Sequence, residues 1–232
     1  LIMTECTMIQ ANTSAFATEP GIYNAEQISA WKKITDAVHA KGGKIVMQIW
    51  HAGRAAHPAL NQGIESISSS AIAIEGDIHT PNGKVPNAVP RALSIEEIPA
   101  IVQAYAQAAK NAIAAGFDGV EVHGANGYLI DQFLRDGANQ RTDAYGGSLE
   151  NRARFLFEVL EAVSAAIGSD RVGLRISPLN SYNSMIDSNP LALTQFLAER
   201  LNAFNLAYLH LMRADFFQAQ TGDVISIARQ YY

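Results

Sequence analysis

The sequence lacks the features of secreted, membrane or nucleic-acid-binding proteins. Its single cysteine, Cys6, excludes an intrachain disulfide, so a reducing compartment and a cytoplasmic, soluble protein are expected. The longest apolar runs, such as Ile45 to Met47, fall far short of the roughly 20 residues that cross a bilayer. The chain has no basic stretch, and its 17 Lys and Arg against 22 Asp and Glu argue against nucleic acid as a partner.

Two common enzyme patterns are also absent. No Gly-x-Gly-x-x-Gly follows a predicted strand, so a Rossmann dinucleotide site has little support. Three histidines at or near predicted strand ends, His51, His123 and His210, would suit a divalent-metal site in a barrel hydrolase. No His-x-His pair or carboxylate motif accompanies them, so this enzyme class is the weaker alternative.

The chain instead shows alternating helix and strand patterns over its whole length. Helices are expected where capping residues precede apolar stripes. The first follows Asn24 with Gln27 and has the stripe Ile28, Trp31, Ile34 and Val38, and the second follows Ser94 with Glu97 and has the stripe Ile98, Ile101, Tyr105 and Ala109. Further helices are expected after Ser148, after Asn189 with Pro190, and near Thr221. Strands are expected between them at 44–50, up to His123, at 172–176 and at 207–212.

This alternation predicts a parallel α/β fold, and polar residues at strand ends favour a TIM (β/α)8-type barrel with its site at the carboxyl edge of the strands. We expect a single domain over residues 1–232. Two long polar loops, about 75–91 and 178–190, each follow a strand. In barrel enzymes such loops form lids or specificity elements, although they are also compatible with disorder or a decorative role.

The most informative segment runs from Phe117 to Tyr128. A short apolar strand ends at His123, and glycines let the chain turn immediately afterwards. On a helical turn His123 and Asn126 would share a face and offer N–H donors to one oxygen, with Tyr128 nearby as a proton donor. The alternative is structural: a satisfied core histidine, a turn-capping asparagine and a packed tyrosine.

The two-residue period of the strands places further polar side chains inside the barrel. Gln48 shares a face with Trp50, and Arg175 shares one with Gly173. Buried amides and charges need partners. Either Arg175 pairs with Glu121 while Gln48 bonds backbone, or both side chains contact a bound planar heterocycle whose negative charge Arg175 opposes.

Several motifs, in order along the chain, closely resemble the Old Yellow Enzyme family of flavin-dependent ene-reductases. They are Met3-Thr-Glu-Cys6, Pro20-Gly-Ile-Tyr23, Gln48-Ile-Trp-His-Ala-Gly-Arg54, Pro90-Arg-Ala-Leu93, His123-Gly-Ala-Asn-Gly-Tyr128, Asn139-Gln-Arg-Thr-Asp143 and Tyr145-Gly-Gly-Ser148. The resemblance implies an FMN-containing barrel in which NADPH or NADH reduces the flavin and an activated alkene then takes the hydride.

The resemblance also implies roles for individual residues. Gln48 and Arg175 would contact the flavin, with Cys6 against it where relatives usually have alanine or glycine. His123 and Asn126 would bind the carbonyl or nitro oxygen of a small-molecule substrate, and Tyr128 would protonate the α-carbon. The pocket walls would be Trp50 and Phe16, the latter in place of a tyrosine found in several bacterial relatives.

By the family's order, five to six β/α units are expected here, with the first, seventh and eighth strands missing. A barrel of this type closes eight strands in about 250 residues, so a shorter set would leave open sheet edges. A cofactor-poor segment that binds FMN weakly, lacks independent catalysis and self-associates through its edges is therefore the alternative to an active reductase.

Overall fold

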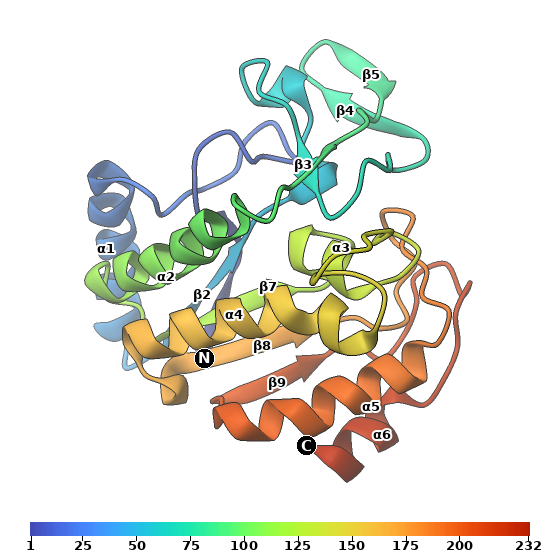
Figure 1. The fold of residues 1–232 in the computed structure, drawn as a ribbon. Coiled ribbons are helices and arrows are strands. Elements are labelled where there is room, and N and C mark those ends of the chain that lie inside the picture. The colour runs from blue at the N-terminus through green and yellow to red at the C-terminus, as the bar shows by residue number, and fades with distance from the viewer.

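A parallel five-stranded sheet organises the structure, a computed structural model that describes residues 1–232 (Figure 1). Its strands lie in the order β1-β2-β7-β8-β9, and every neighbouring pair is parallel. Their bounds are Ile2–Met8 (β1), Ile45–Trp50 (β2), Gly119–Gly124 (β7), Val172–Ile176 (β8) and Tyr208–Leu211 (β9). The predicted parallel α/β class is confirmed, and β1 and β9 are the edge strands of the sheet.

One long helix follows each of the first four strands of this sheet, and a shorter helix follows the last (Figure 1). They are Ala25–His39 (α1), Ile98–Ala114 (α2), Leu149–Ile167 (α4), Pro190–Leu201 (α5) and Val224–Tyr231 (α6). An additional short helix, Leu129–Leu134 (α3), follows β7 directly and was not predicted. Because parallel strands need crossover connections, this alternation brings all the carboxyl ends of the strands to one edge.

The predicted helix starts are largely confirmed. Asn24 forms a complete capping box with Gln27, Ser148 caps α4, and Asn189 caps α5 with a proline at the first helical turn. The start at Ser94 was wrong, because the backbone first makes a turn and α2 begins at Ile98. The last helix likewise begins later than expected, at Val224.

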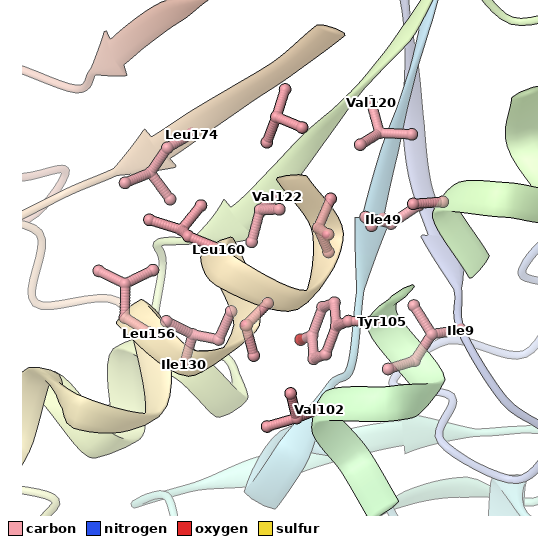
Figure 2. Packing of buried hydrophobic residues seen from close by; sticks show 14 of the residues in the cluster. Ile9, Ile49, Val102, Tyr105, Val120, Val122, Ile130, Leu156, Leu160 and Leu174 are labelled. Carbon is pink, nitrogen blue, oxygen red and sulfur yellow. The ribbon is translucent and has the colours of Figure 1, made fainter. Parts of the chain in front are cut away.

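The sheet and helices enclose an apolar core on one face of the sheet. Ile49, Val122 and Leu174 point from three strands toward Tyr105 of α2 and Leu160 of α4, and all are buried (Figure 2). The predicted stripe of α2 is entirely buried, as its helical spacing required. The predicted apolar stripe of α1 was wrong at Ile34, which is 49% exposed. The fully buried residue of that helix is its neighbour Thr35.

The two long loops have defined structures. The segment 75–91 contains an antiparallel hairpin of Asp77–Thr80 (β4) and Gly83–Pro86 (β5), which projects beyond the carboxyl edge of the sheet (Figure 1). Short flanking strands, Ile67–Ser68 (β3) and Arg91–Ala92 (β6), pair at its base, and two single-turn helices, Gly53–Ala55 (η1) and Pro58–Leu60 (η2), precede it. Two further single turns lie at Ser169–Arg171 (η3) and Asn202–Phe204 (η4).

The segment 178–190 has no regular structure before α5 begins at its end, but buried arginines tie it to the rest of the chain. Arg54 donates to the carbonyl oxygens of Asn183 and Ser184, and Arg152 forms a buried ion pair with Asp187 at 2.6 Å. Since the loop backbone finds partners in this way, it is held over the carboxyl edge of the sheet. None of the helices combines the length and apolar character that a membrane span requires.

Candidate active site

The second face of the sheet carries polar side chains, as the two-residue period predicted. In the paired register, Cys6 lies beside Gln48, which lies beside Glu121, and the next level places His123 beside Arg175 and Arg175 beside His210. The predicted shared face of Gln48 with Trp50 agrees with this register, in which Trp50 lies beside Met8. A polar surface therefore lies opposite the apolar core.

Polar contacts connect Cys6, Gln48, Glu121 and His210 into one continuous network. The Gln48 Nε2 donates to Glu121 Oε1 at 2.6 Å, and His210 Nδ1 lies 3.0 Å from Glu121 Oε2. The thiol of Cys6 donates to Gln48 Oε1 at 3.0 Å, and burial raises the pKa of this thiol to about 12, so it stays protonated. The orientation of the Gln48 amide is thus set from both sides.

Arg175 does not take the partner that the structural alternative assigned to it. Glu121 accepts from Gln48 and contacts His210, and no ion pair joins it to Arg175. The Nε of Arg175 is buried without any hydrogen-bond partner. The Nε atoms of Arg54, Arg135 and Arg152 are also unpartnered, but their other guanidinium nitrogens bond protein groups, whereas Arg175 forms no side-chain hydrogen bond or ion pair. Because an unpaired guanidinium is costly to bury, Arg175 is the side chain of the polar face best placed to meet acceptor atoms of a ligand.

His123 lies at the end of β7 and is 2% exposed. Its Nδ1 accepts the backbone N–H of Ala125 at 3.2 Å, which leaves Nε2 to carry the ring proton. Burial, and after it the positive charge of Arg175, lowers the pKa of His123 to about 3. The side chain is therefore a neutral N–H donor near pH 7, as the interpretation of this segment as an oxygen-binding group requires.

Asn126 follows in a left-handed conformation with φ of 55°. The predicted helical turn from His123 to Asn126 was wrong: the strand continues to Gly124, and a turn at Asn126 and Gly127 leads into α3. Asparagine tolerates this backbone because its side chain finds local hydrogen bonds. The side-chain Oδ1 accepts from Asn180 Nδ2 at 2.9 Å, so the Nδ2 group of Asn126 is left available as a donor.

Tyr128 packs in an aromatic group with the two predicted wall residues. Trp50 is fully buried and meets the Tyr128 ring edge-on, with centroids 4.2 Å apart, and Phe16 stacks on Trp50 at 6.3 Å. His123 meets Tyr128 edge-on at 5.3 Å. Burial raises the pKa of the Tyr128 hydroxyl, so it stays protonated and can act as a proton donor.

A cavity of about 560 Å³ opens beside this aromatic group, between the β4–β5 hairpin and the 178–190 loop. Of the predicted site residues it contacts only Phe16, which is 51% exposed, and Tyr128. The other predicted residues lie deeper, on or just beyond the sheet. The sequence did not predict that the loop residues Tyr182 and Asn183 line this cavity. The one signal in that segment is its high content of asparagine and serine after β8, which indicates a loop but not a binding role.

The three histidines of the metal alternative do not form a site. No group of three or more His, Cys, Asp or Glu side chains is placed to hold a metal ion. His51 accepts the Gly53 N–H on Nδ1, and burial lowers its pKa to about 3, which fits a structural role at the start of η1.

Comparison with known proteins identifies relatives over nearly the whole chain. The model of the NADH:flavin oxidoreductase / NADH oxidase family matches residues 1–229. A probable flavin mononucleotide-dependent alkene reductase of Leishmania infantum is 56% identical over 228 residues, which is 96% of this chain and 62% of the relative. The 12-oxophytodienoate reductase 7 of Oryza sativa subsp. japonica is 52% identical over 91% of this chain and 56% of its own length.

Solved structures agree in fold. The old yellow enzyme from Trypanosoma cruzi superposes with a TM-score of 0.96 at 44% identity, covering 100% of this chain and 67% of that protein. Morphinone reductase gives a TM-score of 0.93 at 40% identity, covering 99% of this chain and 64% of that protein. The chain thus spans less than two thirds of the length of the curated relatives, and its five strands match part of their barrel. The sequence motifs, the parallel sheet and these matches agree, and the chain belongs to the NADH:flavin oxidoreductase family of Old Yellow Enzyme type.

Proposed function

We propose that this chain carries the flavin-facing and substrate-binding residues of an FMN-dependent ene-reductase. The protein would take hydride from NADH or NADPH and reduce the C=C bond of an α,β-unsaturated carbonyl or nitro compound. The main observation is the arrangement at the end of β7, where neutral His123 meets the protonated Tyr128 edge-on and Asn126, between them in sequence, has an oriented side-chain amide. The relatives support the class, since one is named an FMN-dependent alkene reductase.

The polar face fits a planar flavin with alternating donors and acceptors. Arg175 offers a buried Nε without a partner, and Gln48 offers an amide whose orientation is set by Cys6 and Glu121. When bound, FMN would supply the hydride that the substrate receives. Arg175 would place a positive charge against the electron-rich reduced ring, and Cys6 would contact the ring as a neutral thiol. A solved morphinone reductase in complex with tetrahydroNAD supports a nicotinamide as the hydride donor.

The substrate would be held by its oxygen and enclosed by aromatic walls. His123 Nε2 and Asn126 Nδ2 would donate to the carbonyl or nitro oxygen and so draw electron density from the alkene, which is oxyanion-type stabilisation. Tyr128 would then deliver the proton to the α-carbon as a general acid. Trp50 and Phe16 would form the wall, and the neighbouring cavity of about 560 Å³ would admit a small molecule.

The visible absorption spectrum of the protein that carries these residues tests this function. We expect a yellow protein whose flavin bands bleach with NADH or NADPH and recover when cyclohexenone is added. A flavin that is reduced but not reoxidised by cyclohexenone would contradict the proposed substrate class. A colourless protein that never retains added FMN would contradict the cofactor.

The open sheet favours a second candidate for the 232 residues taken alone, a cofactor-poor segment without independent catalysis. Its edge strands β1 and β9 have unpaired backbone groups, a known route to association. Titration of FMN into this segment, with sedimentation at several concentrations, tests it. Stoichiometric tight binding by a monomer would exclude this candidate.

A further inference from the structure

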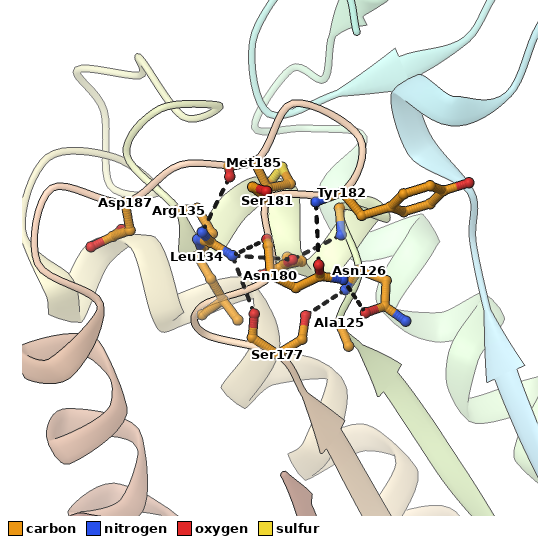
Figure 3. Close-up of polar contacts among 12 residues, drawn as sticks. Ala125, Asn126, Leu134, Arg135, Ser177, Asn180, Ser181, Tyr182, Met185 and Asp187 are labelled. Atoms are coloured by element: carbon orange, nitrogen blue, oxygen red, sulfur yellow. Dashed lines mark hydrogen bonds and ion pairs between the residues drawn. The ribbon is translucent and has the colours of Figure 1, made fainter. Parts of the chain in front are cut away.

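The loop after β8 holds Asn126 on three sides (Figure 3). Ser177 Oγ accepts the Asn126 N–H at 2.7 Å, Asn183 Nδ2 donates to the Asn126 carbonyl oxygen at 2.9 Å, and Asn180 Nδ2 donates to Asn126 Oδ1 at 2.9 Å. Two of these contacts fix the left-handed backbone. The third, from Asn180, is the one that acts on the side-chain amide.

Asn180 is itself held in one orientation. It is fully buried, and its Oδ1 accepts the backbone N–H groups of Tyr182 at 3.4 Å and Phe216 at 3.3 Å. Its carbonyl oxygen also accepts from Arg135 at 3.0 Å (Figure 3). Rotating the Asn180 amide by half a turn would place its NH2 group against these two N–H donors, so its Nδ2 stays directed at Asn126.

We infer that Asn180 is a positioning residue that decides which end of the Asn126 amide faces the substrate. Because Asn180 directs an N–H donor at the Asn126 side chain, Asn126 must turn its Oδ1 toward Asn180 to accept it. The Asn126 NH2 group is then free to donate to the substrate oxygen. The opposite rotamer would bring two NH2 groups together and present a carbonyl oxygen to the substrate, which would repel it. This inference rests on the proposed function for the use of the NH2 group, but not for its orientation.

The decisive variant is Asn180→Asp in the FMN-loaded protein. The introduced carboxylate only accepts when it is ionised, so Asn126 should turn its NH2 group toward it and lose its donor to substrate. We expect reoxidation of the flavin by cyclohexenone to slow by about 100-fold, as for loss of one oxyanion donor, while the flavin content is unchanged. The same group can donate again once it is protonated, so the rate should recover as pH falls, whereas the parent protein should not show this rise.

Controls separate this role from a purely structural one. Asn205→Asp adds the same charge at an exposed position and should leave the rate unchanged. Asn180→Ala should slow the reaction less than Asn180→Asp and without the pH-dependent recovery. If Asn180 acts through Asn126, adding Asn180→Ala to Asn126→Ala should cause no further loss. Equal, pH-independent rates for both Asn180 variants, or additive losses in the double variant, would overturn the inference.

A structural measurement keeps the result independent of the proposed function. A crystal structure or side-chain amide NMR of Asn180→Asp should show the Asn126 NH2 group bonded to the introduced carboxylate. A parent protein that fails to reduce cyclohexenone, together with a turned Asn126 amide in the variant, would contradict only the proposed function. An unturned amide would contradict the inference, and if the variant fails to fold, the Asn180→Ala and double-variant comparison decides.

Discussion

Gln48 and Glu121, directly paired residues of β2 and β7, are joined side chain to side chain by a hydrogen bond of 2.6 Å from Nε2 to Oε1. His210 takes the other carboxylate oxygen, at 3.0 Å. With Glu121 satisfied by these two neighbours, Arg175 keeps a buried Nε without a partner. The polar face therefore combines a network of bonded side chains around Glu121 with Arg175, whose guanidinium has no partner in the protein. We propose that the flavin binds against Arg175.

Replacing Arg175 should weaken FMN binding. Arg175→Met keeps much of the side-chain length but removes the charged donor, and a hydrogen bond to a charged group contributes about 1.5–3 kcal/mol, or about 10- to 100-fold in Kd. Fluorescence titration of FMN into the stripped protein measures this. Arg229→Met, at an exposed position of α6, is the matched control. An unchanged Kd for Arg175→Met would mean that this arginine does not contact the cofactor.

His123→Ala should slow alkene reduction far more than flavin reduction. The substitution removes the neutral N–H donor that we propose binds the substrate oxygen, and loss of one such donor costs about 100-fold or more. Stopped-flow measurement of the two half-reactions separates these steps. His39→Ala, on α1 near the amino ends of the strands, should change neither rate. Equal slowing of both half-reactions would indicate that His123 supports the flavin instead.

Tyr128→Phe should affect proton delivery while preserving the aromatic packing. The ring still meets Trp50 edge-on, but the protonated hydroxyl is gone, and a general acid typically contributes about 100-fold or more. We expect flavin reduction at the parent rate and slow reoxidation by cyclohexenone. The comparison is Tyr231→Phe in the last turn of α6. A parent-like rate of reoxidation in Tyr128→Phe would assign the proton to another donor, such as water.

His51 should make the protein less stable in acid. Burial lowers its pKa from 6.5 to about 3, so between these values the unfolded chain binds more protons than the folded one and the free energy of unfolding rises with pH. In His51→Asn, whose side-chain oxygen can still accept the Gly53 N–H, this slope should fall by about 1.4 kcal/mol per pH unit.

Urea unfolding of the parent and variant between about pH 4 and 6 measures that slope. Other buried groups also contribute to the slope: His123, with its pKa lowered to about 3 by burial, acts in the same direction, and Asp131, with its pKa raised to about 6 by burial, acts in the opposite one. The difference between the two proteins is therefore the quantity to compare. His79→Asn on the exposed side of β4 is the control. A slope unchanged by His51→Asn would mean that His51 is protonated in the folded protein.

Local patterns predicted most of the secondary structure. The strand 172–176 has the predicted bounds, and the caps at Asn24, Ser148 and Asn189 were correct because a capping side chain bonds backbone only two or three residues away. The hairpin at 77–86 was missed, because its strands are short, exposed and stabilised mainly by each other. The error at Ile34 arose because helical spacing cannot say how wide a face the neighbouring elements cover.

The candidate site likewise has features that follow from local sequence and features that follow only from tertiary contacts. The sequence by itself determined that His123, Asn126 and Tyr128 follow one strand, that Gln48 shares a face with Trp50 and that Arg175 shares one with Gly173, since strand periodicity is a local property of the backbone. Only the tertiary structure decided their partners: Glu121 pairs with Gln48 and His210, and Asn180 reaches Asn126 across 54 positions of sequence. Such pairs depend on strand register and on how a loop folds over the sheet edge. Because both are set by packing between distant segments, the orientation of the Asn126 amide follows from the folded protein and from no motif in the chain.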